Sequence, residues 1–196
     1  MKPLIVNCHT GEDLYVEGVE RMRKSAEELG YEVYTEEMSS KGSWTANCAF
    51  KPKFLTSCVA RFGRPLVWVD AAAVLYKPLE HLECPYIEFA VAWDPLLPFK
   101  SFASGVVYLA ATPASHRILE EWGDACNKAV RGKSREWDQV TLYKVWKKMK
   151  DPPVTKILPQ GYVKIFDHPW RGDELQVEYV RHYQFSRQIK RKAKAS

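Results

Sequence analysis

The residue best placed to do chemistry in this sequence is Asp70, which directly follows the apolar run Leu66–Val69. An apolar run without alternation is typical of a strand that is buried on both faces of a parallel sheet. Asp70 would then stand at the carboxyl end of that strand, the edge where open α/β sheets bind ligands. A carboxylate there suits a metal ion, a ribose hydroxyl or a helix N-terminus. The alternative is an acid that merely ends the strand.

Two lysines fall in the first turn of a helix that the sequence predicts over residues 51–62. Phe54, Leu55 and Cys58 recur there on one face, and Gly63 follows as a typical helix end. Lys51 and Lys53 therefore stand where a phosphate would also meet the free amides of the helix N-terminus. The alternative is that both side chains are simply solvated.

The opening of the chain predicts a β-α-β unit, with strands over residues 4–7 and 31–34. Between them Tyr15, Val19, Met22 and other apolar residues recur at helical spacing up to Gly30. The unit lacks G-x-G-x-x-G, which argues against a dinucleotide-binding fingerprint. Neither G-x-S-x-G, H-E-x-x-H nor a P-loop occurs, so hydrolase and NTPase functions have no motif support.

The remainder continues the alternation of strands and helices. A polar loop is expected over 36–47, and the capping pair Thr112-Pro113 begins a helix. Further strands are expected over 86–93, 106–109, 157–159, 162–166 and 177–180, and 157–159 is expected to pair with 162–166. A basic loop is expected over 131–135 and a helix over 136–149. This order predicts a single α/β domain, an α/β/α sandwich with a mostly parallel central sheet.

Composition narrows the class of protein. In 196 residues, 46% are hydrophobic, which is enough for a substantial core. Five scattered cysteines without a CxxC pair argue against structural zinc and indicate reduced thiols in a cytoplasmic protein. Neither a signal peptide nor a membrane span is predicted. The net charge of +5 and the basic run over 187–194 suit a phosphate-bearing partner, or else a solvated terminus.

Four segments occur in one order: Trp68-Val-Asp70-Ala-Ala72, Phe102-Ala-Ser104-Gly105-Val-Val-Tyr108, Thr112-Pro113 with Leu119-Glu-Glu-Trp122, and Trp137-Asp138-Gln139. This set resembles the nucleotide-diphospho-sugar glycosyltransferases of the GT-A fold, over residues 1–190, with 191–196 left as a basic tail. The resemblance implies a GT-A-like, Rossmann-like domain. It also implies transfer of a sugar from a UDP-linked donor to a hydroxyl group, with retention of configuration expected.

Asp70 matches the first acid of the family's Asp-x-Asp motif, which holds Mn2+ or Mg2+ against the donor diphosphate. Ala72 replaces the second acid. Three consequences remain open: Asp70 works with a distant ligand, cations of the chain replace the metal ion, or activity is lost. His182 is the metal ligand that the resemblance implies, and His168 is a rival.

The resemblance also implies the other site residues. Asp138 would contact donor-sugar hydroxyls, and Gln139 would face the anomeric carbon, where a carbonyl oxygen stabilises positive charge. An N-terminal cap is the alternative role of Asp138. The remaining residues expected to bind the donor are Cys8, His9, Thr10 and Tyr15 for the base and ribose, and Lys51, Ser104, Gly105, Ser186, Arg187 and Lys190 around the diphosphate and sugar.

The acceptor is the least constrained partner. The basic loop over 131–135 and the basic tail would suit a polyanion, such as hydroxymethylated DNA modified by a phage-type enzyme. Two other functions stay open at this stage. One is a nucleotide-sugar-binding module without catalysis, for which Ala72 is the support. The other is a nucleic-acid-binding protein, which rests on charge alone.

Overall fold

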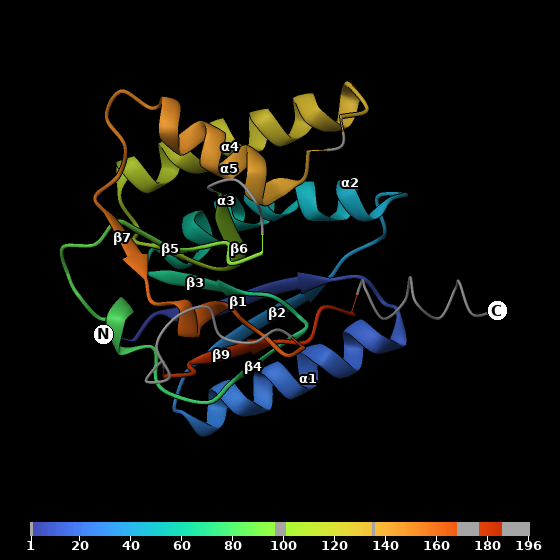
Figure 1. Cartoon of the computed structure of the whole chain (residues 1–196), viewed down its shortest axis with the longest axis vertical. Helices are drawn as coiled ribbons and strands as arrows, with labels where there is room; N and C mark the ends of the chain where they lie inside the picture. Colours follow the sequence, from blue (N-terminus) through green and yellow to red (C-terminus); the bar gives the residue numbers. More distant parts are fainter. Residues whose placement is uncertain (1, 97–100, 135, 168–176, 186–196) are drawn as a thin grey trace.

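The computed structural model describes residues 2–96, 101–134, 136–167 and 177–185. A six-stranded sheet with the order β2-β1-β3-β6-β5-β7 crosses the centre (Figure 1). Its strands are β1 (Leu4–His9), β2 (Val33–Glu37), β3 (Leu66–Val69), β5 (Phe89–Trp93), β6 (Phe102–Leu109) and β7 (Thr155–Leu158). Only β6 pairs antiparallel with its neighbours, so the prediction of a mostly parallel sheet is confirmed.

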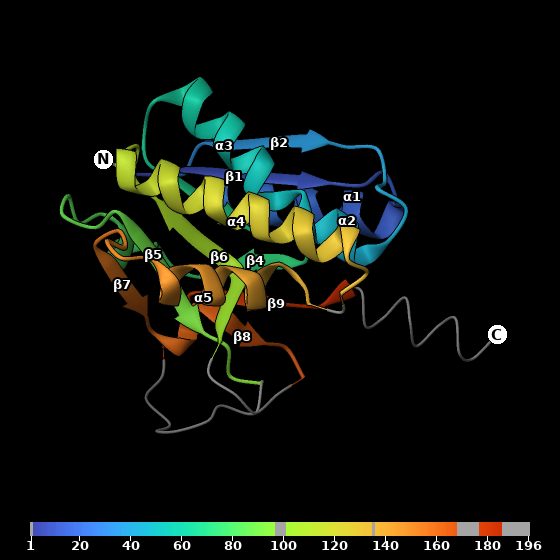
Figure 2. The same ribbon diagram turned by 90° about the horizontal axis from the view of Figure 1, so that it is seen from above.

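The two faces of this sheet are covered differently. Four helices lie on one face: α2 (Trp44–Ala49), α3 (Lys51–Phe62), α4 (Pro113–Arg131) and α5 (Asp138–Lys148). Seen from above, α4 and α5 lie side by side over β5 and β6 (Figure 2). The other face carries α1 (Asp13–Glu28) and a small sheet of β4 (Ala73–Leu75), β9 (Val180–His182) and β8 (Lys164–Ile165). The α/β/α sandwich prediction expected only helices on this face. The layer that contains α1 is instead a mixture of a helix and a small sheet.

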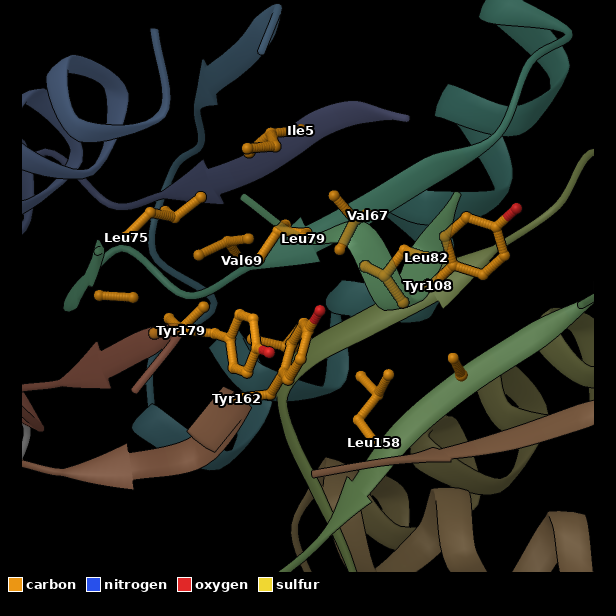
Figure 3. Close-up of a cluster of buried hydrophobic side chains, with 14 of the residues drawn as sticks. Ile5, Val67, Val69, Leu75, Leu79, Leu82, Tyr108, Leu158, Tyr162 and Tyr179 are labelled. Atoms are coloured by element: carbon orange, nitrogen blue, oxygen red, sulfur yellow. The ribbon is translucent and has the colours of Figure 1, made fainter. Parts of the chain in front are cut away.

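The central strand β3 is buried on both faces, as its apolar run predicts. Leu66 and Trp68 pack into the cluster beneath the helices. Val67 and Val69 pack into the opposite cluster, which contains Leu75 of the small sheet and Tyr162 (Figure 3). Successive side chains point to opposite faces of a strand, so a run of four apolar residues fills both clusters at once. This double packing fixes the position of Asp70, which follows β3 directly.

The prediction of a polar loop over residues 36–47 is partly wrong, because β2 extends to Glu37 and α2 begins at Trp44. Ser43 caps this helix, since its side chain accepts a hydrogen bond from the amide of Ala46. None of the six residues of α2 is buried. A short helix without a buried face leaves no apolar periodicity by which the sequence could reveal it.

The expected strand pair over 157–159 and 162–166 is also wrong. β7 joins the main sheet beside β5, and Gln160–Val163 forms a 3-10 turn that leads into β8. Two further differences bear on the site. Ser104 and Gly105 lie inside β6 rather than before it, and β4 follows Asp70 where no strand was expected. Strands of two or three residues are too short to show a pattern in sequence.

All five cysteines are free thiols in the structure. None of the helices in the described part of the chain has the length and apolar character needed to cross a membrane.

Candidate active site

A cleft of about 610 Å³ opens at the carboxyl edge of β1 and β3. Its volume falls within the range of about 300–1,000 Å³ typical of small-ligand sites. Because β6 runs against β3, its first half lies at this same edge, and the amide of Asp70 donates to the carbonyl of Gly105 at 2.9 Å. Nine residues that the sequence singled out line the cleft together: Cys8, His9, Thr10, Tyr15, Lys51, Asp70, Ser104, Asp138 and Gln139.

Lys51 is the centre of the polar floor of this cleft. Its side chain is buried, and its Nζ lies 2.8 Å from Asp138 Oδ2 and 3.3 Å from Asp70 Oδ1. The same ammonium group donates to the carbonyl of Ser104 at 2.9 Å. α3 begins at Lys51 and has Pro52 in its first turn, which places this side chain under the sheet edge. Lys53, by contrast, is exposed.

Electrostatics keep these groups charged. Burial alone would raise the pKa of Asp70, but Lys51, His182 and a 2.6 Å hydrogen bond from Trp68 Nε1 outweigh it and hold the pKa below its usual value. Burial likewise lowers the pKa of Lys51, yet Asp138 and Asp70 outweigh that effect and raise it. At neutral pH the site therefore contains an ionised Asp70 and a protonated Lys51.

Asp138 is held by three elements. It is the first residue of α5, and its buried carboxylate accepts a 2.6 Å hydrogen bond from Ser104 Oγ in addition to the Lys51 contact. Trp122 Nε1 of α4 donates to the backbone carbonyl of Asp138 at 2.9 Å. The capping residue of α5 is Trp137, so the carboxylate of Asp138 points to the cleft floor rather than capping the helix.

Gln139 is oriented by Asp94, an acid that is not among the predicted site residues. Its Nε2 donates to Asp94 Oδ2 at 2.5 Å. Because an ionised carboxylate only accepts hydrogen bonds, this contact fixes which end of the amide meets Asp94 and turns Oε1 away from it. Asp94 lines the cleft and follows the buried strand β5 directly. The pattern of a buried strand ending in an acid, which revealed Asp70, also applied to Asp94.

His182 lies behind Gly105, on β9. Its buried ring places Nε2 3.1 Å from the carbonyl of Tyr162, an arrangement in which Nε2–H donates and Nδ1 keeps its lone pair. Burial lowers the pKa of His182 more than Asp70 raises it, so the ring is neutral at neutral pH. A Cβ on Gly105 would lie 2.9 Å from His182 Nδ1 and 3.3 Å from Asp70 Oδ2. The missing side chain thus lets the imidazole of His182 and the carboxylate of Asp70 both approach the backbone at Gly105.

A Gly105→Ala substitution should destabilise the protein by roughly 1–3 kcal/mol. The new methyl group would lie 2.6 Å from His182 Cε1, so the buried ring would have to move. Gly123→Ala in α4 is the matched control, because its nearest neighbour would be Pro52 Cβ at 3.9 Å. That change should instead stabilise the helix by roughly 0.5–1 kcal/mol. Urea unfolding of both variants measures the difference, and equal stabilities would contradict the crowding at Gly105.

Asp70 and His182 are the two side chains near Gly105 that could bind a divalent metal ion. Among the described residues no group of three or more His, Cys, Asp and Glu could hold a metal ion. Asp70 Oδ2 and a neutral imidazole nitrogen nevertheless flank the space beside Gly105. Mg2+ often takes only one or two protein ligands and completes its shell with phosphate oxygens and water. Asp70 and His182 could therefore supply two ligands to such an ion, and the others would have to come from a bound molecule or from water.

Several predicted residues lie outside the described part of the chain. These are Ser186, Arg187 and Lys190, the rival ligand His168 and the tail 191–196. In the basic loop the described residues 131–134 are exposed at the end of α4. In both views this end lies on the side of the molecule toward which β1 points (Figures 1 and 2).

No protein-family model matches this sequence, and no curated protein matches it either. Solved structures do resemble it. A glycosyltransferase involved in the glycosylation of the major capsid of PBCV-1 is similar over 99% of this chain and 98% of its own, with a TM-score of 0.73 and 15% identity. The glycosyltransferase GlyE of Streptococcus pneumoniae is similar over 93% of this chain and 55% of its own, with a TM-score of 0.61 and 16% identity. At these identities the likeness shows a shared fold.

Proposed function

We propose, from a fold shared with glycosyltransferases, that this chain transfers a sugar from a nucleotide diphosphate donor, UDP-linked, to a hydroxyl acceptor. The observation that carries the proposal is that Lys51, Asp70, Asp138 and Gln139 meet in one cleft at the carboxyl edge of the sheet. That edge is the usual ligand site of open α/β sheets. The GT-A assignment made from the sequence belongs to this same proposal.

The donor would lie along the cleft with its nucleoside against the loop after β1. Cys8, His9, Thr10 and Tyr15 line that end and would receive the base and ribose. Asp70 would face the diphosphate, and Asp138 would accept hydrogen bonds from sugar hydroxyls. Ser186, Arg187 and Lys190 remain the predicted cationic and polar contacts of the diphosphate.

A divalent ion held by Asp70 and His182 would neutralise the diphosphate as it leaves. The residues of the chain supply the rest of the chemistry. As the bond from the anomeric carbon to the diphosphate oxygen breaks, positive charge develops on that carbon. The carbonyl oxygen of Gln139, turned away from Asp94, is the group proposed to stabilise that charge. Lys51 acts on the site itself, because it lowers the pKa of Asp70 and forms ion pairs with the carboxylates of both Asp70 and Asp138.

A panel of nucleotide sugars, screened by thermal unfolding with and without Mn2+, tests the proposal. A ligand that binds only the folded state at a hundredfold excess over its Kd stabilises it by about 2.7 kcal/mol. We expect a UDP-sugar to raise the melting temperature, and to raise it further with Mn2+ present. The absence of stabilisation by every UDP-, GDP- and dTDP-sugar in the panel would contradict the proposal.

The same screen separates the catalytic proposal from its main alternative, a nucleotide-sugar-binding module. Ala72 in place of the second acid is the observation that favours the alternative. Stabilisation by a UDP-sugar without release of UDP during long incubation, with or without acceptors, would support a binding module. Release of UDP would support the transferase.

A further inference from the structure

We infer that the acceptor is a neutral carbohydrate, which stacks on Trp44 and Trp137 and donates a hydroxyl hydrogen bond to Asp94. This inference rests on the proposed function and names the acceptor class of the same cleft. All three side chains line the cleft, and the two indole rings lie 6.4 Å apart at an angle of 57°.

The aromatic wall comes from a helix that packs poorly by itself. No residue of α2 is buried, and Trp44 is 40% exposed although it is the largest apolar side chain of that helix. Trp44, Asn47 and Cys48 line the cleft and follow the helical spacing of i, i+3 and i+4. Isolated helices this short are marginal in water, and this one turns its indole ring to an open cavity. A ligand that covered the ring would remove that apolar surface from water.

The position of the wall points to the acceptor rather than to the donor nucleoside. Trp137 directly precedes Asp138 and Gln139, which the proposed function assigns to the donor sugar. The loop after β1, assigned to the base and ribose, comes from the opposite side of the sheet edge, next to α1. A group stacked on Trp137 would therefore lie next to the anomeric carbon, where an attacking hydroxyl must come.

The charged side chains that line the cleft indicate which class of acceptor it would bind. Among the described residues that line it, Asp70, Asp94 and Asp138 stand against a single cationic side chain, Lys51, which is committed to Asp70 and Asp138. A sugar offers the complementary chemistry, because its hydroxyls donate to a carboxylate and its C–H face packs on an indole ring. The exposed residues 131–134, which include Arg131 and Lys133, lie outside this lining.

Transfer assays with Trp44→Ala and Trp137→Phe test the inference. The donor is the UDP-sugar selected by the stabilisation screen, and the acceptors are lactose, maltose, cellobiose and a DNA duplex containing 5-hydroxymethylcytosine. We expect transfer to at least one disaccharide, with a KM for it about tenfold higher in Trp44→Ala. Stabilisation by the UDP-sugar should persist in both variants, which also shows that they fold. Tyr86→Ala, at an aromatic residue 81% exposed outside the cleft, is the control and should leave transfer unchanged.

Each result bears on a different statement. Transfer to the duplex alone, refusal of all three disaccharides, or an unchanged disaccharide KM in both tryptophan variants would overturn the inference and leave the proposed donor chemistry standing. If no nucleotide sugar stabilises the wild-type protein, the proposed function fails and the acceptor inference fails with it.

Discussion

Replacing Lys51 with methionine should destabilise the protein by about 3–5 kcal/mol, the usual cost of removing one partner from a buried ion pair. The 2.8 Å contact between Lys51 Nζ and Asp138 Oδ2 joins side chains that are 7% and 5% exposed. Without the ammonium group, the buried carboxyl group of Asp138 would lose its 2.8 Å ion-pair partner and would have little access to water in its place. Asp70 would lose the partner that holds its pKa down. Donor binding should fail as well, because two unneutralised carboxylates would face the diphosphate.

Lys53→Met is the matched control for this experiment. Lys53 belongs to the same turn of α3 but is exposed, so its loss should change stability by no more than about 0.5 kcal/mol. Urea unfolding at pH 7 measures both variants, and thermal shift with the selected UDP-sugar measures donor binding. Equal stabilities for the two variants would show that the buried pair contributes little. Normal donor binding by Lys51→Met would show that Lys51 is not needed to bind the donor.

The sequence revealed those elements whose pattern follows from burial alone. Leu66–Val69 must be apolar throughout because both of its faces are covered, so the strand and the acid at its end were both predictable. Gly30 and Gly63 were predictable as helix ends for a backbone reason, since their φ angles of 77° and 57° favour glycine.

Contacts made between distant segments could not be predicted in the same way. A lysine in the first turn of a helix is solvated by default, and only the packing of α3 against α4, β1 and β3 buries Lys51 beside Asp138. The contact of Gln139 with Asp94 joins residues 45 positions apart in the sequence. No local sequence pattern predicts such a contact, although each of the two residues lies at the end of a strand or helix with buried apolar residues.

The buried position of Asp138 decides how the catalytic proposal should be tested. Substituting both Asp138 and Gln139 with alanine should not leave the fold intact, because Lys51 would lose its closest anionic partner and Ser104 Oγ its acceptor. A loss of activity in that double variant would report stability as much as chemistry. Gln139 is only partly buried, and its described side-chain hydrogen bond is to Asp94, which also lines the open cleft.

Gln139→Ala should therefore reduce kcat by roughly 10²–10³-fold, the typical cost of removing one group that stabilises charge in a transition state. Its melting temperature and its stabilisation by the UDP-sugar should stay close to those of the wild type. Asp94→Asn tests the orienting contact separately. An amide at residue 94 could either accept a hydrogen bond from Gln139 or donate one to it, so it would no longer fix the orientation of Gln139. We expect a fall in kcat of about tenfold for Asp94→Asn.

Initial-rate measurements of UDP release give both values. A kcat within threefold of the wild type for Gln139→Ala would exclude the carbonyl oxygen of Gln139 from the reaction. A full rate for Asp94→Asn beside a slow Gln139→Ala would keep the catalytic role but remove the orienting role of Asp94. Because Asp94 is proposed to orient Gln139 rather than to bind the donor, both substitutions should lower kcat more than they change the KM for the donor.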